Sequence, residues 1–371
     1  MDVSRRGWLG LAGAAASTQA SAITIRQIAV DSTGFAPAPG IAHLKYNENP
    51  LGPPASAMEA MAALARSNWY YADDAEARLA AMIGKRLGVP AAQVVLGHGS
   101  SEVITSAALA WGKRGTILLP ALQFDEPLLY PMAQGLSYRL VAMAPDLGID
   151  LAALARAAAA PDVAMVYLCN PNNPTGMMLK PAELVAFAKA LPPRVTLLVD
   201  EAYMELADDP AASTMLPLVQ GGANIIVTRT FSKLFGMAGL RIGYAVALPA
   251  NAAELKRHRL TISLNAPGLA AAIAAWDDAP FQQQSRTQIM AARRVLQAAV
   301  TKAGTTALPS QTNFLFVKVA NADRFAAAMA QRGILVRGAW GPAWPLWSRV
   351  STGRMIDVER YAAALPALVQ A

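Results

Sequence analysis

The chain of 371 residues has little of what forms covalent crosslinks or metal sites. Cys169 is the only cysteine, so an internal disulfide is excluded. The three histidines show no metal-ligand spacing, and we therefore expect no catalytic metal. Hydrophobic residues make up 54% of the chain, but alanine dominates them, which indicates helix formers rather than membrane spans.

Charged residues are also scarce. The net charge is +7, yet only 15% of the residues are charged, no long basic run occurs and no nucleic-acid motif is present. We therefore expect a mildly basic surface that suits anionic substrates, and no nucleic-acid partner.

Apolar strand-like runs alternate with alanine-rich helical stretches between about residues 94 and 247, as is typical of a mostly parallel sheet covered on both faces. Strands are expected at 94–96, 116–119, 165–169, 197–200, 224–228 and 243–247. Beyond residue 255 the helices lengthen, for example at 291–303, and short strands are expected at 313–319 and 347–351. We therefore predict a large α/β domain followed by a smaller α+β domain.

The first residues have a different character. Residues 4–9, SRRGWL, match a twin-arginine signal, and a weakly apolar stretch and a small-residue cleavage site at 20–22 follow. This pattern predicts export to the periplasm by the twin-arginine (Tat) machinery, which carries folded proteins. The alternative is an N-terminal extension of a cytoplasmic protein. The predicted divisions are a signal at 1–22, a segment at 23–49 that joins the small domain or covers the site, a large domain at 50–255 and a small domain at 256–371.

One lysine stands in an unusual setting. Lys233 follows the hydroxyl-bearing residues Thr230 and Ser232, and Arg241 comes eight residues later. The lysine amine can form a Schiff base with an aldehyde cofactor, while the hydroxyls and the arginine can hold a phosphate. Alone, the segment 230–233 would more often be a surface lysine after a polar turn. Together with Arg241, it indicates a binding site for pyridoxal phosphate (PLP).

Two segments upstream strengthen that interpretation. The apolar run 197–199 ends at Asp200, with Tyr203 three positions on. Carboxylates at the carboxyl ends of parallel strands face the ligand crevice, where Asp200 can pair with the pyridine nitrogen of PLP. The strand at 166–169 runs into residues 170–176, NPNNPTG, a turn whose asparagine amide can donate to the same cofactor.

These segments, in this order, resemble the fold-type I, class I and II aminotransferases over about residues 44–353. Within that family the similarity is to the histidinol-phosphate aminotransferase branch. Its hallmarks appear at 45–53 (KYNENPLGP), 97–102 (GHGSSE) and 170–176. The resemblance implies a PLP-dependent transferase that works as a homodimer.

The resemblance also implies roles for individual residues. Lys233 would carry the cofactor, Asp200 would pair with its ring nitrogen, and Asn173 and Tyr203 would bind its phenolic oxygen. Its phosphate would be held by Thr230, Ser232, Arg241 and the backbone amides of Ser100 and Ser101. Those two amides follow a short strand and open an apolar helix, which is a natural anion site.

Two positions depart from the family pattern. Where an aromatic residue usually stacks on the cofactor ring, the chain offers Phe124, with Leu122 as the alternative if the register slips by two residues. In relatives a tyrosine reaches across the dimer to the partner's phosphate. Tyr71 is the expected counterpart and Tyr70 the alternative.

Three residues are predicted to bind the substrate. Arg349, in the segment 347–353, matches an arginine that grips the substrate's anionic group in relatives, and a guanidinium suits a carboxylate or phosphate. Arg337 has a counterpart in the substrate pocket, although an exposed charge at a strand end explains it equally well. Asn47 completes the set. The aromatic stretch 340–347 either lines an apolar pocket or packs as a rigid loop.

The expected activity is a PLP-dependent aminotransferase that moves an amino group from an amino acid or histidinol phosphate to a 2-oxo acid in a ping-pong cycle. A β-lyase or decarboxylase on the same scaffold remains an alternative, since fold does not settle function. A catalytically silent exported binding protein is a third. The presence of Lys233, Asp200, Tyr203 and Arg241 together counts against it.

Overall fold

The computed structural model describes residue 34 and residues 36–369. The architecture below belongs to one compact unit, Pro39–Ala371. Within the described residues, no helix combines the length and apolarity that a membrane crossing requires. The predicted signal at 1–22 lies outside the described residues.

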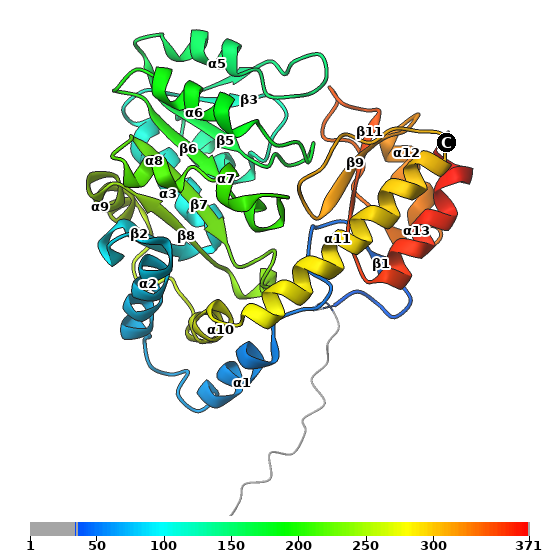
Figure 1. The fold of residues 1–371 in the computed structure, drawn as a ribbon, viewed down its shortest axis with the longest axis horizontal. Helices are drawn as coiled ribbons and strands as arrows, with labels where there is room; N and C mark the ends of the chain where they lie inside the picture. The colour runs from blue at the N-terminus through cyan, green and yellow to red at the C-terminus, as the bar shows by residue number, and fades with distance from the viewer. Residues whose placement is uncertain (1–33, 35, 370–371) are drawn as a thin grey trace, which may run out of the picture. The chain divides into compact units, whose positions relative to one another are not determined.

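A seven-stranded sheet forms the centre of the larger part (Figure 1). Its strands are β2 (Val94–His98), β3 (Thr116–Pro120), β4 (Tyr138–Val141), β5 (Val163–Cys169), β6 (Thr196–Asp200), β7 (Ile225–Thr230) and β8 (Ile242–Ala247). They lie in the order β2-β8-β7-β6-β5-β3-β4, and within this sheet only β8 runs antiparallel to its neighbours. Every residue of β5 is buried, as expected for a parallel strand covered on both faces.

Helices cover both faces of the sheet. They are α1 (Ala55–Leu64), α2 (Asp73–Leu87), α3 (Gly99–Gly112), α4 (Leu129–Ala133), α5 (Leu151–Ala158), α6 (Pro181–Ala190), α7 (Pro210–Ser213), α8 (Leu216–Gln220), α9 (Pro249–His258) and α10 (Ala266–Trp276). Alternate residues of β3 enter different cores: Ile117 and Leu119 pack with α3 and α9, and Leu118 packs with the helices of the opposite face. The predicted α/β class with a mostly parallel sheet is confirmed.

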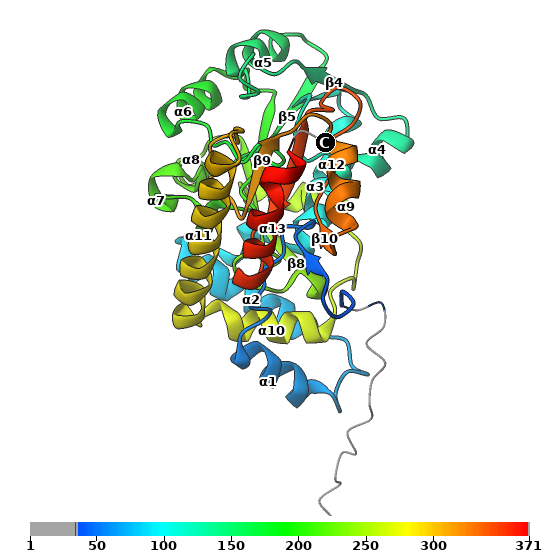
Figure 2. The same ribbon diagram turned by 90° about the vertical axis from the view of Figure 1, so that its right-hand side faces the viewer.

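A second core lies toward the C-terminus. It is built on α11 (Ala279–Lys302), α12 (Ala322–Ala330), α13 (Met355–Leu368), β1 (Ala42–His43), β9 (Phe314–Lys318), β10 (Ile334–Leu335) and β11 (Trp347–Ser351). Strand β11 pairs antiparallel with β9, and β1 pairs parallel with β10. Figures 1 and 2 both show α11 and α13 side by side. The early strand β1 is therefore packed with elements made some 290 residues later.

The chain passes from the core of the large sheet to the C-terminal core at a higher residue number than predicted. Helix α10 packs against α1 and α2, and its Leu269 and Trp276 belong to the core of the large sheet. Along α11, Ile289 still lies in that core, whereas Ala292 lies in the C-terminal core. The division predicted at residue 255 thus falls ahead of two helices that pack, wholly or in part, with the large sheet.

Candidate active site

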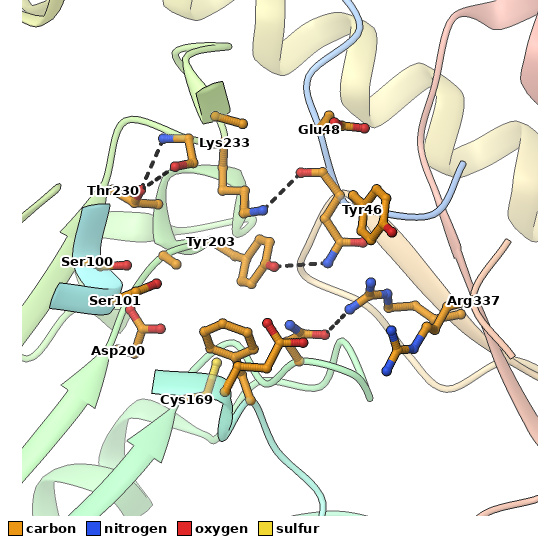
Figure 3. Close-up of a pocket in the computed structure, with 18 of the residues that line it drawn as sticks. Tyr46, Glu48, Ser100, Ser101, Cys169, Asp200, Tyr203, Thr230, Lys233 and Arg337 are labelled. Carbon is orange, nitrogen blue, oxygen red and sulfur yellow. Dashed lines mark hydrogen bonds between the residues drawn. The ribbon is translucent and has the colours of Figure 1, made fainter. Parts of the chain in front are cut away.

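A cavity of about 300 Å³ lies at the carboxyl ends of β5, β6 and β7 (Figure 3). Asp200 and Thr230 are the last residues of β6 and β7, so the sheet itself brings them together. The predicted residues that line the cavity are Asn47, Ser100, Ser101, Phe124, Asn173, Asp200, Tyr203, Thr230, Ser232, Lys233, Arg241, Arg337 and Arg349. Tyr71 is the one predicted residue that does not line it.

Lys233 extends from the loop after β7 toward the segment that carries Tyr46 and Glu48 (Figure 3). Its Nζ donates a hydrogen bond of 3.1 Å to the backbone oxygen of Asn47. Burial, followed by the positive charge of Arg349, lowers the pKa of Lys233 to about 8. About a tenth of this amine is therefore unprotonated at about pH 7, far more than for an ordinary lysine, and the free amine is the nucleophilic form.

Asp200 is 1% exposed. Burial raises the pKa of its carboxyl group to about 7, although hydrogen bonds from the Thr228 hydroxyl, at 2.9 Å, and from the Ala202 amide act in the opposite direction. No described residue forms a salt bridge with Asp200 at 4.0 Å or less. A cationic group in the cavity would stabilise the charged carboxylate.

Tyr203 is held from two sides. Its ring packs edge-on against Phe314 at 5.3 Å between centroids, and its hydroxyl accepts a 2.9 Å hydrogen bond from Asn47 Nδ2. Burial raises the pKa of Tyr203, so the hydroxyl keeps its hydrogen. Asn173 lies nearby with its Oδ1 accepting from Arg349 Nη1, at 2.5 Å, which leaves its Nδ2 as the group available to donate.

The N-terminus of α3 and the side chain of Arg241 converge at the other end of the cavity. Gly99, the first residue of α3, has φ +77°, and a Cβ atom there would meet the Arg241 guanidinium. A Cβ atom at Gly243 would meet the backbone nitrogen of Ser100. Only glycines permit this close approach.

Hydroxyl groups complete this end of the cavity. Thr230 Oγ1 donates to Ser232 Oγ at 2.9 Å, and Arg241 Nη1 donates to the same Ser232 oxygen at 3.3 Å. The other bond of Nη1 goes to a backbone carbonyl, that of Ala238. None of the hydrogen-bond partners named here is a carboxylate. Helix amides, a guanidinium and hydroxyls are the groups that bind a phosphate, so this end of the cavity fits one.

Two arginines form the wall opposite. Arg337 and Arg349 are joined by backbone hydrogen bonds in both directions, and each guanidinium lies 5.2 Å from the ring of Trp340. Arg349 is 5% exposed; its Nη2 donates to the backbone oxygen of Lys45 at 2.8 Å, and its Nε is buried without a partner in the described residues. Burial, followed by the charge of Arg337, lowers the pKa of Arg349 to about 10.

Comparison with known proteins identifies the family. The family model described as aminotransferase class I and II matches residues 40–365. The chain belongs to this family. The prediction of a PLP-dependent aminotransferase of fold type I is confirmed, and the enzyme uses PLP.

Individual relatives of this aminotransferase share most of its length. It is 37% identical to histidinol-phosphate aminotransferase 1 of Cupriavidus pinatubonensis, over 88% of each chain. It is also 37% identical to histidinol-phosphate aminotransferase 2 of Ralstonia nicotianae, over 89% and 88% of the two chains. The crystal structure of histidinol-phosphate aminotransferase from Sinorhizobium meliloti in complex with pyridoxal-5'-phosphate has a TM-score of 0.77 and 30% identity, over 89% and 91% of the chains.

Of the two positions at which alternatives were left open, the structure distinguishes the candidates at one. Phe124 lines the cavity of the aminotransferase, whereas Leu122 is fully buried and its carbonyl accepts a bond from Asn172. Tyr71 is 79% exposed and lies outside the cavity of its own subunit, as does Tyr70 at 61%. The role expected of Tyr71 in a partner's site stays a prediction.

Several cavity residues were not predicted from the sequence. They are Tyr46, Glu48, Glu126, Cys169, Ala202 and Ala238. Tyr46 and Glu48 belong to the hallmark segment 45–53, and Glu126 comes two residues after Phe124, so their positions in the sequence offered a signal. In the aromatic stretch 340–347, Trp340 lines the cavity, whereas Trp347 begins strand β11 and stacks on Phe316.

Proposed function

We propose that this aminotransferase takes its amino group from a donor with an anionic end, an amino acid or histidinol phosphate, and passes it to a 2-oxo acid in a ping-pong cycle. The proposal of a donor with an anionic end rests on the buried side chain of Arg349. Its guanidinium bonds only to neutral oxygens, those of Asn173 and of the Lys45 backbone, and its Nε has no partner in the described residues. Such a charge remains available to an anion, and Arg337 lies beside it.

The names of the relatives support histidinol phosphate as one of the two donors to test. That donor carries a phosphate, whereas amino acids carry a carboxylate. A guanidinium fork binds either group through paired hydrogen bonds. The indole ring of Trp340, which lines the cavity 5.2 Å from each guanidinium, offers an apolar surface to the rest of the donor.

The residues of the cavity also fit the cofactor. When bound, PLP supplies an electron-withdrawing ring that stabilises negative charge at the donor's α-carbon. We assign Lys233 as the covalent attachment point, Asp200 as the partner of the ring nitrogen and Phe124 as the stacking residue. Asn173 and Tyr203 donate to the phenolic oxygen. The phosphate is bound by Ser100, Ser101, Thr230, Ser232 and Arg241.

Lys233 is also the base of the proposed reaction. Its lowered pKa, about 8, leaves part of the amine free to remove the proton from the donor's α-carbon near neutral pH. Asp200 keeps a proton on the ring nitrogen, because its carboxylate is too deeply buried to stay charged without a cationic partner. Lys233 thus moves the proton of the α-carbon, while Asp200 keeps the ring nitrogen protonated.

Replacement of Arg349 tests the donor class. The holoenzyme is mixed with single amino acids or histidinol phosphate, and the change in cofactor absorbance reports amino transfer. In Arg349→Ala, kcat/KM toward the best anionic donor should fall at least about tenfold, since charge-assisted contacts contribute roughly 1.5–3 kcal/mol. Cofactor absorbance should persist.

Arg324→Ala, which removes an exposed arginine of α12, serves as the control. Arg241→Ala should instead weaken retention of PLP. If Arg349→Ala loses the cofactor yet keeps its efficiency toward anionic donors, the assignment of the donor's anionic end to Arg349 is wrong.

Export to the periplasm is a separate proposal, which rests on the sequence pattern of residues 4–9, the weakly apolar stretch after it and the small residues at 20–22. Its test is fractionation of cells that produce the full chain, with Arg5→Lys and Arg6→Lys together as the comparison. A periplasmic protein that becomes cytoplasmic in the double variant would support export. A protein found in the cytoplasm in both cases would contradict it.

A further inference from the structure

Asn47 occupies a strained and buried position between the two cores. Its φ is 56°, in the left-handed region that asparagine tolerates better than most residues, and it is 1% exposed. Its backbone oxygen accepts from Lys233 Nζ at 3.1 Å and from Asn313 Nδ2 at 2.9 Å. One residue thus contacts both the proposed catalytic lysine and the turn before β9.

The side-chain amide of Asn47 is oriented by Ser351. The Ser351 hydroxyl accepts from the Asn47 backbone nitrogen at 2.8 Å and donates its single hydrogen to Asn47 Oδ1 at 2.6 Å. With Oδ1 fixed on Ser351, Nδ2 faces the Tyr203 hydroxyl at 2.9 Å. In this orientation three hydrogens have acceptors: the Asn47 backbone N–H, the Ser351 hydroxyl hydrogen and one hydrogen of Asn47 Nδ2.

The direction of the bond to Tyr203 has a chemical consequence. Because Asn47 Nδ2 donates, the Tyr203 oxygen acts as the acceptor and its own hydrogen is free to point elsewhere. We propose that Asn47 is a positioning residue that turns the Tyr203 hydrogen into the cavity, toward the phenolic oxygen of PLP. This inference rests on the proposed role of Tyr203 and assigns Asn47 a task other than the substrate contact expected from the sequence.

The surroundings of Tyr203 are compatible with this role. The charged or titratable groups that act on it are Arg349, Cys169 and Asp200, and Lys233 Nζ lies 5.5 Å from its ring centroid. None of these four forms a hydrogen bond with the Tyr203 hydroxyl. Asn47 therefore sets the direction of that hydroxyl.

Asn47→Asp tests the proposal with little change in shape. Aspartate accepts the left-handed backbone, but its carboxylate replaces the donor with an acceptor and draws the Tyr203 hydrogen away from the cavity. An oxygen that loses a donor holds a proton more tightly. The apparent pKa of the cofactor's visible absorbance, titrated in the holoenzyme, should therefore rise by about one unit or more.

Tyr203→Phe separates the hydrogen bond from the new charge. Alone, it should raise the same pKa. In the Tyr203→Phe background, Asn47→Asp should add only a minor further shift. An equal shift in both backgrounds would mean that the charge acts directly on the cofactor, and the proposal would be overturned. No shift from Asn47→Asp in the wild-type background would overturn it as well.

Ser351→Ala provides a second variant in case Asn47→Asp does not fold. Without the Ser351 hydroxyl, the Asn47 amide is free to turn, and the pKa should shift in the same direction by a smaller amount. An unchanged pKa in this variant contradicts the proposal. If Tyr203→Phe itself leaves the pKa unchanged, the assignment of Tyr203 under the proposed function fails instead.

Discussion

At the scale of the residue, Asp200 is buried, and both of its hydrogen-bond donors are neutral groups. They are the Thr228 hydroxyl and the Ala202 amide. Burial raises its pKa to about 7, above the 3.8 of an ordinary aspartate. The folded, cofactor-free protein therefore binds this proton more tightly than the unfolded chain does. The stability that comes from the protonated carboxyl is lost as the pH rises toward and through 7.

Asp200→Asn should consequently stabilise the cofactor-free protein. The gain in the free energy of unfolding should be on the order of 1–3 kcal/mol at about pH 8 and smaller at about pH 5, because only the wild type must bury a charge at the higher pH. Urea unfolding at the two pH values measures it. The same variant should retain PLP less well, since the ring nitrogen loses its anionic partner. Equal gains at both pH values would contradict this account.

Lys233 gives a second prediction at this scale. The rate at which cofactor-free protein captures added PLP should increase as the pH rises through about 8, because the lysine attacks only as the free amine. Borohydride treatment of the loaded enzyme should then fix the label on Lys233, as peptide mapping would show. Lys233→Ala is the matched control. A label on another lysine, or a labelled control, would refute the assignment.

Much of the cavity could be predicted because its residues lie in short local motifs. Asp200 ends β6, and Lys233 and Asn173 lie within four residues of the ends of β7 and β5, so the sequence around them indicated their position at the edge of the sheet. The task of Asn47 was not predictable in that way. Its amide is oriented by Ser351, 304 residues away, and no local pattern records such a contact.

At the scale of the element, the N-terminus of α3 and strand β8 must lie close together to form the phosphate end of the cavity. Gly243 of β8 has no room for a Cβ atom beside the Ser100 nitrogen. Gly243→Ala should displace the first turn of α3 and weaken the affinity for PLP about tenfold or more, as overpacking typically costs 1–3 kcal/mol. Spectroscopic titration with PLP measures this change.

Gly239→Ala is the matched control for that variant. It lies four residues earlier, and a Cβ atom there would meet nothing within 4 Å. Its affinity for PLP should stay close to that of the wild type. If both variants bind PLP equally well, the close approach of β8 to α3 does not shape the phosphate site.

The elements themselves were predicted unevenly. The strands expected at 116–119, 197–200 and 243–247 correspond to β3, β6 and β8, because continuous buried apolar runs mark them clearly. Strand β4 was missed: it is short, lies at the edge of the sheet and is largely exposed, so it lacks that signal. Helix α10 was assigned to the wrong core because its alanine-rich sequence does not specify which surface it packs against.

At the scale of the whole molecule, the connection between α1 and α2 displays three exposed aromatic residues. Trp69, Tyr70 and Tyr71 are 76%, 61% and 79% exposed. Large apolar side chains gathered in this way typically mark an interaction surface. They suit the proposed two-fold dimer, in which Tyr71 would enter the site of the partner subunit.

Subunit mixing tests this arrangement. Lys233→Ala and Tyr71→Ala subunits should each be nearly inactive, but a hybrid dimer would contain one site with both residues intact. An equal, freely exchanging mixture should therefore regain roughly a quarter of wild-type activity, because half of its dimers are hybrids with one working site of two. The absence of recovery, or a monomer by light scattering, would count against the shared site.

The pairing of β1 with β10 affects the order in which the enzyme matures during synthesis. A chain emerging from the ribosome folds its N-terminal parts first, and the last strand of the large sheet, β8, ends at Ala247. Until Ile334 emerges, β1 has no strand to pair with, and until Ser351 emerges the Asn47 side chain has nothing to orient it. The side of the cavity that carries Arg337 and Arg349 can therefore assemble only after residues 334–351 have left the ribosome. A nascent chain that stalls earlier would keep its sheet but have no means of selecting a donor.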